Sequence, residues 1–155
     1  MQWLKGAYAV TDDQAALDPE AVFGFLRESY WAKGIARETC LRSLEHSLCF
    51  VLLHAGRLVG FCRAVTDCAT FAYLCDVFVL PEHRGQGLGK WMVGCVLAHP
   101  DLQGLRRLLL ATVNAHGLYS QVGFAPMARP ELFMEIVRSY DDRPDCCGGG
   151  CRPES

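Results

Sequence analysis

The stretch from Phe71 to Lys90 restricts the possible folds of this chain more than any other feature. Phe71 to Leu80 is almost uninterruptedly apolar and ends at a proline. A glycine-dense turn follows, and apolar residues from Leu88 to Val96 then repeat at helical spacing. A second apolar run extends from Leu108 to Val113. Strands that are apolar on both faces are typical of parallel pairs, so the pattern predicts a strand–helix–strand unit with a right-handed crossover.

The remaining elements predict one α/β domain over residues 1–138, with a mixed sheet of about six or seven strands. The residue patterns predict a strand at Gly6–Thr11, helices from Asp18 to about Tyr30 and from Arg37 to His46, a hairpin of Leu48–His54 and Leu58–Val65, a short helix from Asn114 or Ala115 to Val122, and a last strand at Glu131–Val137. Residues 139–155 are rich in cysteine and glycine and are expected to be a flexible tail.

Length and composition exclude several classes of protein. The chain has 155 residues, which suffices for one domain with a sizeable core. Its formal net charge is −2 and its basic residues are scattered, so nucleic acid is not the expected ligand. No apolar run reaches the roughly 20 residues of a membrane helix, and the first residues lack the apolar core of a signal peptide. We therefore expect a cytoplasmic protein that does not bind membranes.

The chain contains nine cysteines, an odd number. Six of them lie in apolar or helical stretches and are expected to be thiols in a reducing compartment (Cys40, Cys49, Cys62, Cys68, Cys75 and Cys95). The other three, Cys146, Cys147 and Cys151, are too few for a typical four-ligand zinc site. We expect no bound metal.

The glycine turn differs from two common phosphate-binding motifs. A Walker loop needs four residues between its first glycine and its Gly-Lys pair, but only three separate Gly85 from Gly89-Lys90. A dinucleotide fingerprint needs Gly-x-Gly-x-x-Gly in the first strand–helix unit, whereas this turn reads Gly-x-Gly-x-Gly in the middle of the chain. Neither motif fits.

Two segments together resemble the GNAT superfamily of N-acetyltransferases. Arg84-Gly85-Gln86-Gly87-Leu88-Gly89 matches the superfamily signature Arg/Gln-x-x-Gly-x-Gly/Ala, with His83 where tyrosine is common. About thirty residues later, Gly117 to Phe124 is similar to the family segment LYxxxGF. The order of elements from Gly6 to Val137 also agrees. The resemblance implies a mostly antiparallel sheet with a central splayed parallel pair and about four flanking helices.

The resemblance also implies acetyl-CoA as the co-substrate. In family members the pantetheine arm pairs with the free backbone of the first splayed strand, here Val77, Phe78 and Val79. The pyrophosphate binds the N–H groups of the turn, here from Gly85 through Gln86, Gly87, Leu88 and Gly89 to Lys90. Backbone contacts of this kind require small residues and unoccupied donors. Asn114 is a weaker candidate for cofactor contact, because related proteins place asparagine seven rather than five residues before the tyrosine.

The family reaction is direct attack of a primary amine on the thioester. Tyr119 matches the tyrosine that protonates the departing thiolate. An alkylamine is mostly protonated at neutral pH, so a base is needed. Asp76, the charged residue within Phe71–Leu80, is one candidate, and polyamine-acetylating relatives carry an acidic residue at this place. His116, one helical turn before Tyr119, is another, and a water chain is a third.

Acceptor choice in this superfamily depends mainly on the first two helices and their loop. Here that loop carries Tyr30 and Trp31, whose rings could line an apolar or cation–π wall for an amine. The expected partner is a small-molecule or peptide amine, and the chain could form a homodimer. The alternative function is a non-catalytic module that binds acyl-CoA or another protein.

Overall fold

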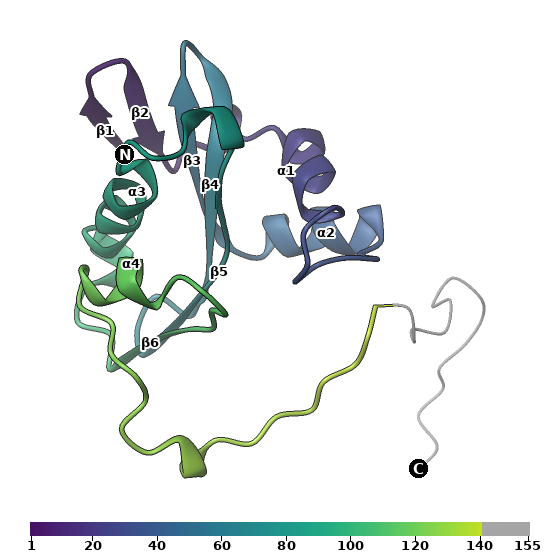
Figure 1. Cartoon of the computed structure of the whole chain (residues 1–155), viewed down its shortest axis with the longest axis vertical. Coiled ribbons are helices and arrows are strands. Elements are labelled where there is room, and N and C mark those ends of the chain that lie inside the picture. Colours follow the sequence, from purple (N-terminus) through teal and green to yellow (C-terminus); the bar gives the residue numbers. More distant parts are fainter. Residues whose placement is uncertain (141–155) are drawn as a thin grey trace.

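The computed structural model describes residues 1–140, in which six strands form one sheet in the same order as they occur in the chain (Figure 1). The strands are β1 (Gln2–Lys5), β2 (Tyr8–Thr11), β3 (Leu48–His54), β4 (Arg57–Thr66), β5 (Phe71–Val79) and β6 (Arg107–Leu110). All neighbouring strands are antiparallel except β5 and β6, which are parallel. This arrangement confirms the predicted mixed, mostly antiparallel sheet.

Helices cover both faces of the sheet. They are α1 (Pro19–Leu26), α2 (Arg37–Glu45), α3 (Leu88–Leu97) and α4 (His116–Ser120), and short 3₁₀ turns lie at Gln14–Ala16, Pro81–His83, Pro100–Leu102 and Pro130–Leu132. Helix α3 buries Met92, Val93 and Val96 in a core with β2 to β5, whereas α1 and α2 bury Val22 and Leu44 in a second core on the opposite face. Apolar residues on both sides of β3 and β4 therefore hold two helical layers. No helix among residues 1–140 is long and apolar enough to cross a membrane.

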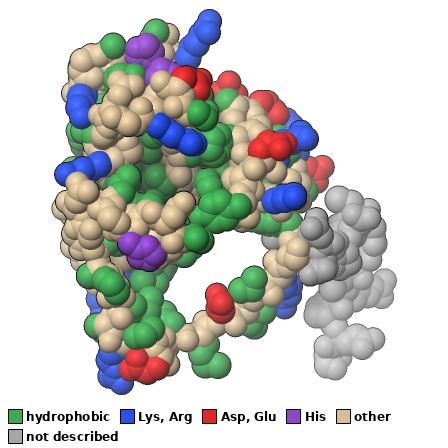
Figure 2. All heavy atoms as spheres, in the orientation of Figure 1, with side chains coloured by type: hydrophobic (Ala, Val, Ile, Leu, Met, Phe, Trp, Pro, Cys, Tyr) green, Lys and Arg blue, Asp and Glu red, His purple; other side chains and the backbone are tan. Residues whose placement is uncertain are grey.

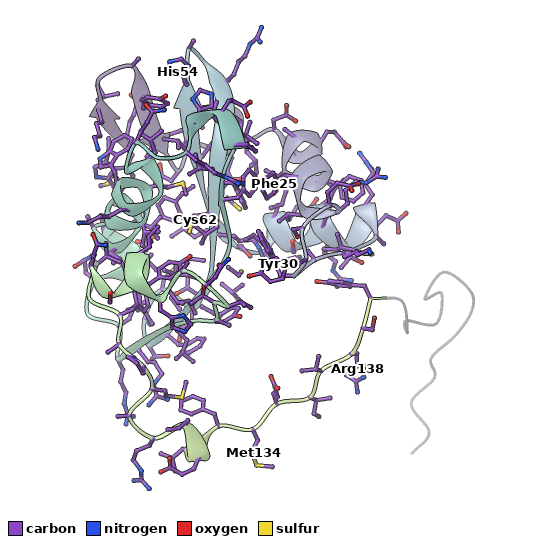
Figure 3. All side chains as sticks on the ribbon, viewed as in Figure 1. Phe25, Tyr30, His54, Cys62, Met134 and Arg138 are labelled. Carbon is purple, nitrogen blue, oxygen red and sulfur yellow. The ribbon has the colours of Figure 1, made fainter. Side chains whose placement is uncertain are left out.

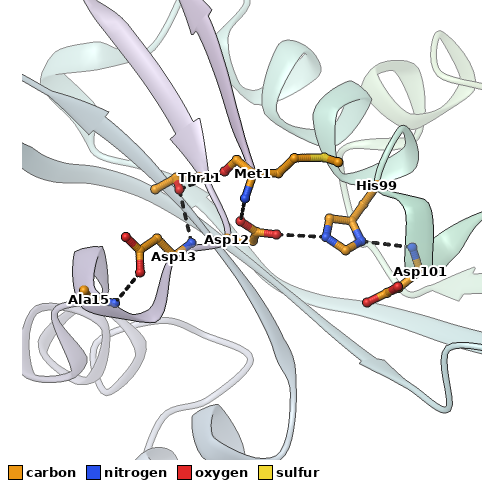
Figure 4. A network of polar contacts seen from close by, with 7 residues as sticks. All are labelled: Met1, Thr11, Asp12, Asp13, Ala15, His99 and Asp101. Carbon is orange, nitrogen blue, oxygen red and sulfur yellow. Dashed lines mark hydrogen bonds and ion pairs between the residues drawn. The ribbon is translucent and has the colours of Figure 1, made fainter.

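A polar network ties the end of α3 to the end of β2 (Figure 4). The Nε2 atom of the buried His99 lies 2.9 Å from a carboxylate oxygen of Asp12, and the backbone N–H of Asp101 donates to His99 Nδ1. The nitrogen of Met1 also contacts Asp12. The network holds the first hairpin against the layer that carries the glycine turn.

Several predicted elements differ from the structure. The first strand is preceded by β1, which the sequence analysis missed because its residues are mostly exposed. Helix α1 ends at Leu26 rather than near Tyr30, and β6 ends at Leu110 rather than Val113. The predicted last strand at Glu131–Val137 does not form. Because it is absent, the parallel pair lies at one edge of the described sheet. The predicted domain boundary at residue 138 stays a prediction, and the cysteines at 146, 147 and 151 lie outside the described residues.

The feature that positions the site is a bulge in β5. Phe78 pairs with Phe61 and Cys75 pairs with Arg63, so two β5 residues, Asp76 and Val77, lie opposite the single residue Cys62. Asp76 has a φ of 54°, a left-handed conformation that aspartate tolerates better than most residues. On its other side β5 pairs with β6 only as far as Leu74, opposite Leu110. The five residues from Cys75 to Val79 therefore have no neighbour on that side among the described strands.

Candidate active site

The glycine turn forms an open cradle of backbone donors at the start of α3. Gly85 and Gly87 have φ values of 77° and 71°, which side chains disfavour. Gly87 is the N-cap of α3, and none of the described side chains caps the first-turn N–H groups of Leu88, Gly89 and Lys90. These donors border a cavity of about 500 Å³ that also contacts Val77 and Val79. The loop and the unpaired part of β5 thus line one continuous surface.

Side chains around the cradle hold the loop in place. The Arg84 guanidinium donates a 2.7 Å hydrogen bond to the Val79 carbonyl, and the Lys90 ammonium donates to the Gln121 side chain at 2.9 Å. His83 lines the cavity and its Nδ1 lies 3.0 Å from the Tyr8 hydroxyl. Gln86 does not line the cavity, because its side chain is directed to Tyr8 and to the His83 carbonyl. The predicted role of Gln86 therefore depends on its backbone alone.

Tyr119 lies where this cavity meets a second one. It is the only α4 residue that lines both cavities within the described chain, and its side chain packs edge-on against Phe124. Burial raises the pKa of its phenol to about 12. No hydrogen bond to its hydroxyl occurs among residues 1–140. Tyr119 is therefore a protonated donor at the junction, with its hydroxyl group uncommitted in the described chain.

Asp76 lies in the second cavity, which measures about 590 Å³. One carboxylate oxygen accepts a 2.7 Å hydrogen bond from Arg63 Nε, and the other accepts a 3.1 Å bond from Trp31 Nε1. Only 9% of the Asp76 side chain is exposed. Each carboxylate oxygen retains a lone pair for a further donor. Asp76 is therefore held in place and can still accept a hydrogen bond from a ligand.

Aromatic rings make up much of the wall around Asp76. Phe25, Tyr30, Trp31 and Tyr73 line the same cavity, and Tyr30 packs edge-on against Trp31 with ring centroids 5.1 Å apart. Phe25 stacks on Phe78 of the bulged strand at 3.8 Å, which joins the wall to the backbone that borders the first cavity. Figure 3 shows Phe25 and Tyr30 on the face of β5 that α1 and α2 cover.

Two other predicted residues lie elsewhere. Asn114 lines the aromatic cavity rather than the loop cavity, on the side of Asp76. His116 lies at the first turn of α4 and lines neither cavity; with Tyr119 it lines a groove beside β6. The structure therefore groups Tyr119 with Asp76 and the glycine loop, and it places His116 on the other side of Tyr119.

A family model described as "Acetyltransferase (GNAT) domain" matches residues 45–126, from the end of α2 past the end of α4. The matched residues include the glycine loop, the bulged strand and Tyr119. A protein of Gibberella zeae that is assigned by name to the acetyltransferases is 32% identical over 162 residues, covering 90% of this chain and 85% of the relative.

The chain belongs to the GNAT acetyltransferase family.

Solved structures agree with this assignment. A GNAT-family acetyltransferase from Xanthomonas campestris pv. campestris is 48% identical, with a TM-score of 0.82 and coverage of 84% of this chain and 93% of that one. The chloroplastic serotonin N-acetyltransferase 2 of Oryza sativa subsp. japonica is 33% identical over 127 residues, covering 76% of this chain and 62% of the relative. A GNAT structure from Elizabethkingia anophelis with acetyl-CoA bound shares the fold at 14% identity and a TM-score of 0.61. The N-acetyltransferase assignment made from the sequence is confirmed.

Several residues of this GNAT site escaped the sequence analysis. Phe25 and Tyr73 both line the aromatic cavity, but their apolar character predicts no more than packing positions in a helix and a strand. Arg63 was not singled out, yet it is the ion-pair partner of Asp76. A lone arginine in an apolar strand could have suggested a partner for the lone aspartate of the next strand. Register alone could not have paired them, because the bulge shifts the alignment.

Proposed function

We propose that this GNAT enzyme transfers the acetyl group of acetyl-CoA to the primary amine of a small molecule with an aromatic or apolar body. The observation that supports this most directly is the position of Tyr119 between the two cavities. One cavity offers backbone donors, and the other offers rings and one carboxylate. A thioester in the first and an amine in the second would meet beside the phenol.

In this proposal the glycine loop and the unpaired edge of β5 bind acetyl-CoA. The N–H groups at the start of α3 suit a pyrophosphate, because they are uncapped and lie at the positive end of the helix dipole. The edge of β5 beyond Leu74 pairs with no described strand and offers backbone groups to the pantetheine amides, although the Val79 carbonyl already accepts a hydrogen bond from Arg84. The side chains of Lys90 and His83 line the same cavity, where the Lys90 ammonium adds positive charge. Asn114, which lines the other cavity, would contact the acetyl end at most.

The amine nitrogen attacks the thioester carbonyl carbon, and the resulting oxyanion accepts a hydrogen bond from the backbone N–H of Val79. The carbon–sulfur bond then breaks, and the Tyr119 hydroxyl gives its proton to the departing sulfur. The acylated nitrogen loses its extra proton, which returns to the Tyr119 phenolate and restores the phenol. Asp76 attracts the acceptor as an ammonium ion and holds it while one proton passes to water. Because Arg63 and Trp31 already bind both carboxylate oxygens, we assign Asp76 to amine binding and the base to a water chain.

The acceptor class follows from the wall around Asp76. A single carboxylate among four rings fits one cationic nitrogen on an apolar body, through charge and cation–π attraction. A polyamine has two or more cationic nitrogens and would leave at least one of them against rings without a carboxylate. The similarity to a serotonin N-acetyltransferase supports the same choice.

The six described cysteines are all thiols, in keeping with a reducing compartment such as the cytoplasm.

The test is turnover of acetyl-CoA over a panel of amines, followed by chromatography of the acetylated product. Aromatic primary amines such as phenethylamine should show a kcat/KM at least about tenfold above that of spermidine or a lysine peptide. Preference for spermidine would overturn the acceptor class and leave the transferase activity intact. Acetyl-CoA binding without turnover of any amine would overturn the catalytic proposal in favour of a binding module.

A further inference from the structure

The partner of the Asp76 carboxylate lies behind the wall of the aromatic cavity. Arg63 reaches Asp76 from β4 and does not line the cavity itself. Only 16% of the Arg63 side chain and 9% of the Asp76 side chain are exposed, so water screens the pair weakly. In Figure 2 hydrophobic side chains gather between the α1–α2 layer and the rest of the molecule, the region in which Figure 3 places Tyr30. An amine that binds there meets an ion pair in apolar surroundings.

Arg63 is fixed on its other side by the end of α2. Its Nη1 donates a 3.1 Å hydrogen bond to the Ser47 hydroxyl, which donates in turn to the Ser43 carbonyl at 2.7 Å. Ser43 lies in the last turn of α2, where the carbonyl groups form the negative end of the helix dipole. Burial disfavours the charged guanidinium, but the attraction of Asp76 outweighs burial and raises the pKa of Arg63. The guanidinium is therefore a permanent positive charge at a fixed position.

Four thiols surround the ion pair and carry no charge near neutral pH. Arg63 lies opposite Cys49 of β3 and opposite Cys75 of β5, and Cys40 of α2 and Cys62 of β4 lie close by. Burial raises the pKa of all four thiols, to about 11 for Cys49 and to about 12 for Cys75. None of these thiols therefore neutralises the guanidinium.

Other titratable groups near the pair are three phenols of the cavity wall and three exposed charged groups, namely Tyr30, Tyr73, Tyr119, Glu20, Arg84 and Glu135. Burial raises the pKa of the Tyr73 phenol and that of the Tyr119 phenol, the latter to about 12. Water screens the three exposed charges. The ion pair of Asp76 and Arg63 therefore dominates the electrostatic field at a bound amine near neutral pH.

We propose that Arg63 is a positioning residue of the acceptor site, which holds the Asp76 carboxylate in place and whose positive charge makes the bound ammonium group release a proton to water. The N–H bond breaks, its electron pair stays on nitrogen for attack on the thioester, and the proton leaves with water. Asp76 alone would hold the ammonium form, whereas Arg63 offsets that attraction. This role rests on the proposed function and explains how water suffices as the base.

The size of the effect follows from the contacts that one carboxylate makes. A guanidinium and an ammonium group bound to the same carboxylate lie roughly 5–6 Å apart. At an effective dielectric constant of about 20, their repulsion lowers the pKa of the bound amine by about one to two units. This shift applies to the substrate, so it can be measured in the pH dependence of kcat.

The first test uses the wild-type protein with saturating acetyl-CoA and phenethylamine, and measures kcat from pH 6 to 10 by chromatography of the product. The acidic limb of the profile should lie about one to two pH units below the pKa of the amine in solution, which is about 10. A β-fluorinated phenethylamine is a weaker base and should move the limb to lower pH, which assigns the limb to the amine. A limb at the solution pKa of each amine would overturn the role of Arg63.

The second test replaces the charge. Arg63→Gln should move the acidic limb up by about one to two pH units, so that kcat falls about 10- to 100-fold at pH 7 and recovers towards pH 10. Arg63→Lys keeps the charge and should keep the limb within about half a pH unit of the wild type. A merely structural role predicts an equal loss of kcat at every pH, and that result would contradict the proposal. If Arg63→Gln does not fold, Arg63→Lys and the wild-type profiles still decide.

Arg37→Gln is the matched control. Arg37 also forms an ion pair, with Glu20, but 55% of its side chain is exposed and it lines neither cavity of the candidate site. Its replacement should leave the limb unchanged, and a shift equal to that of Arg63→Gln would overturn the proposal. Absence of turnover with any amine would overturn the proposed function and this role together. Turnover with an unshifted limb would overturn the role of Arg63 alone.

Discussion

Replacement of Tyr119 by phenylalanine removes one hydroxyl from the junction of the two cavities. No described residue forms a hydrogen bond with that hydroxyl, and the ring keeps its contact with Phe124. The substitution should therefore change the stability of the fold very little. We expect the midpoint of thermal unfolding to shift by less than about 2 °C. The effect should fall on the chemical step, where the phenol is proposed to protonate the departing thiolate.

The size of the loss in rate follows from the pKa values of two neighbouring groups. Burial raises the pKa of the Tyr119 phenol to about 12. Cys75, which lines the adjoining cavity, shows what the same surroundings do to a thiol: burial, aided by Asp76, raises its pKa to about 12. If the coenzyme thiol is desolvated to a similar degree, its pKa matches that of the Tyr119 phenol. The free energy of proton transfer from the phenol to the thiolate is then close to zero. General acid catalysis under that condition contributes about 10² to 10⁴ in rate, or about 2.7 to 5.5 kcal/mol.

The assay is kcat at saturating acetyl-CoA and amine between pH 6 and 9, followed by chromatography of the product because the many protein thiols interfere with thiol reagents. Tyr119→Phe should lose at least about a hundredfold in kcat at every pH in this range, with KM for the amine changed little. A variant with kcat within threefold of the wild type, and with unaltered coenzyme binding, would refute the role of the phenol.

Three further outcomes follow from the same contacts. The raised pKa of Tyr119 means that the folded protein holds this proton more tightly than the unfolded chain, so the stabilisation is complete below pH 10. It should decline between about pH 10 and 12, a loss that Tyr119→Phe lacks in alkaline urea titrations. Asp76→Asn breaks the ion pair with Arg63 and should cost roughly 1–3 kcal/mol in urea unfolding and raise KM for the amine; unchanged values of both would contradict its assigned role. Gly87→Val forces a side chain into positive φ and should weaken coenzyme binding at least about tenfold by calorimetry. Gly94→Ala, in the middle of α3 with nothing near its added methyl group, should bind normally and gain about 0.5–1 kcal/mol.

The βαβ core can be predicted from the sequence because its signals are local. The apolar run of β5, the helical spacing of α3 and the glycines between them each depend on neighbouring residues in the chain. The predicted strand at Glu131–Val137 was wrong for the described chain, for a physical reason. Its alternating residues favour an extended chain, but a strand also needs an edge to pair with, and composition does not say where that edge lies.

The candidate site also has features that the sequence predicts and features that it does not. The cradle and Tyr119 were found from motifs, because backbone donors and a single tyrosine are fixed by local spacing. The partners of Asp76 were not, since Arg63 and Trp31 reach it from another strand and another layer.

By itself, the sequence determined the phosphate loop, the family resemblance and the presence of one isolated acid in an apolar strand. Only the tertiary structure decided that the acid lies at a bulge and is bound by Arg63. It also decided that β5 parts from β6 after Leu74, and that Tyr119 stands between the two resulting cavities. Bulges and strand separation depend on hydrogen bonds between distant segments. Such bonds form only when the whole sheet assembles, so no local sequence pattern predicts them.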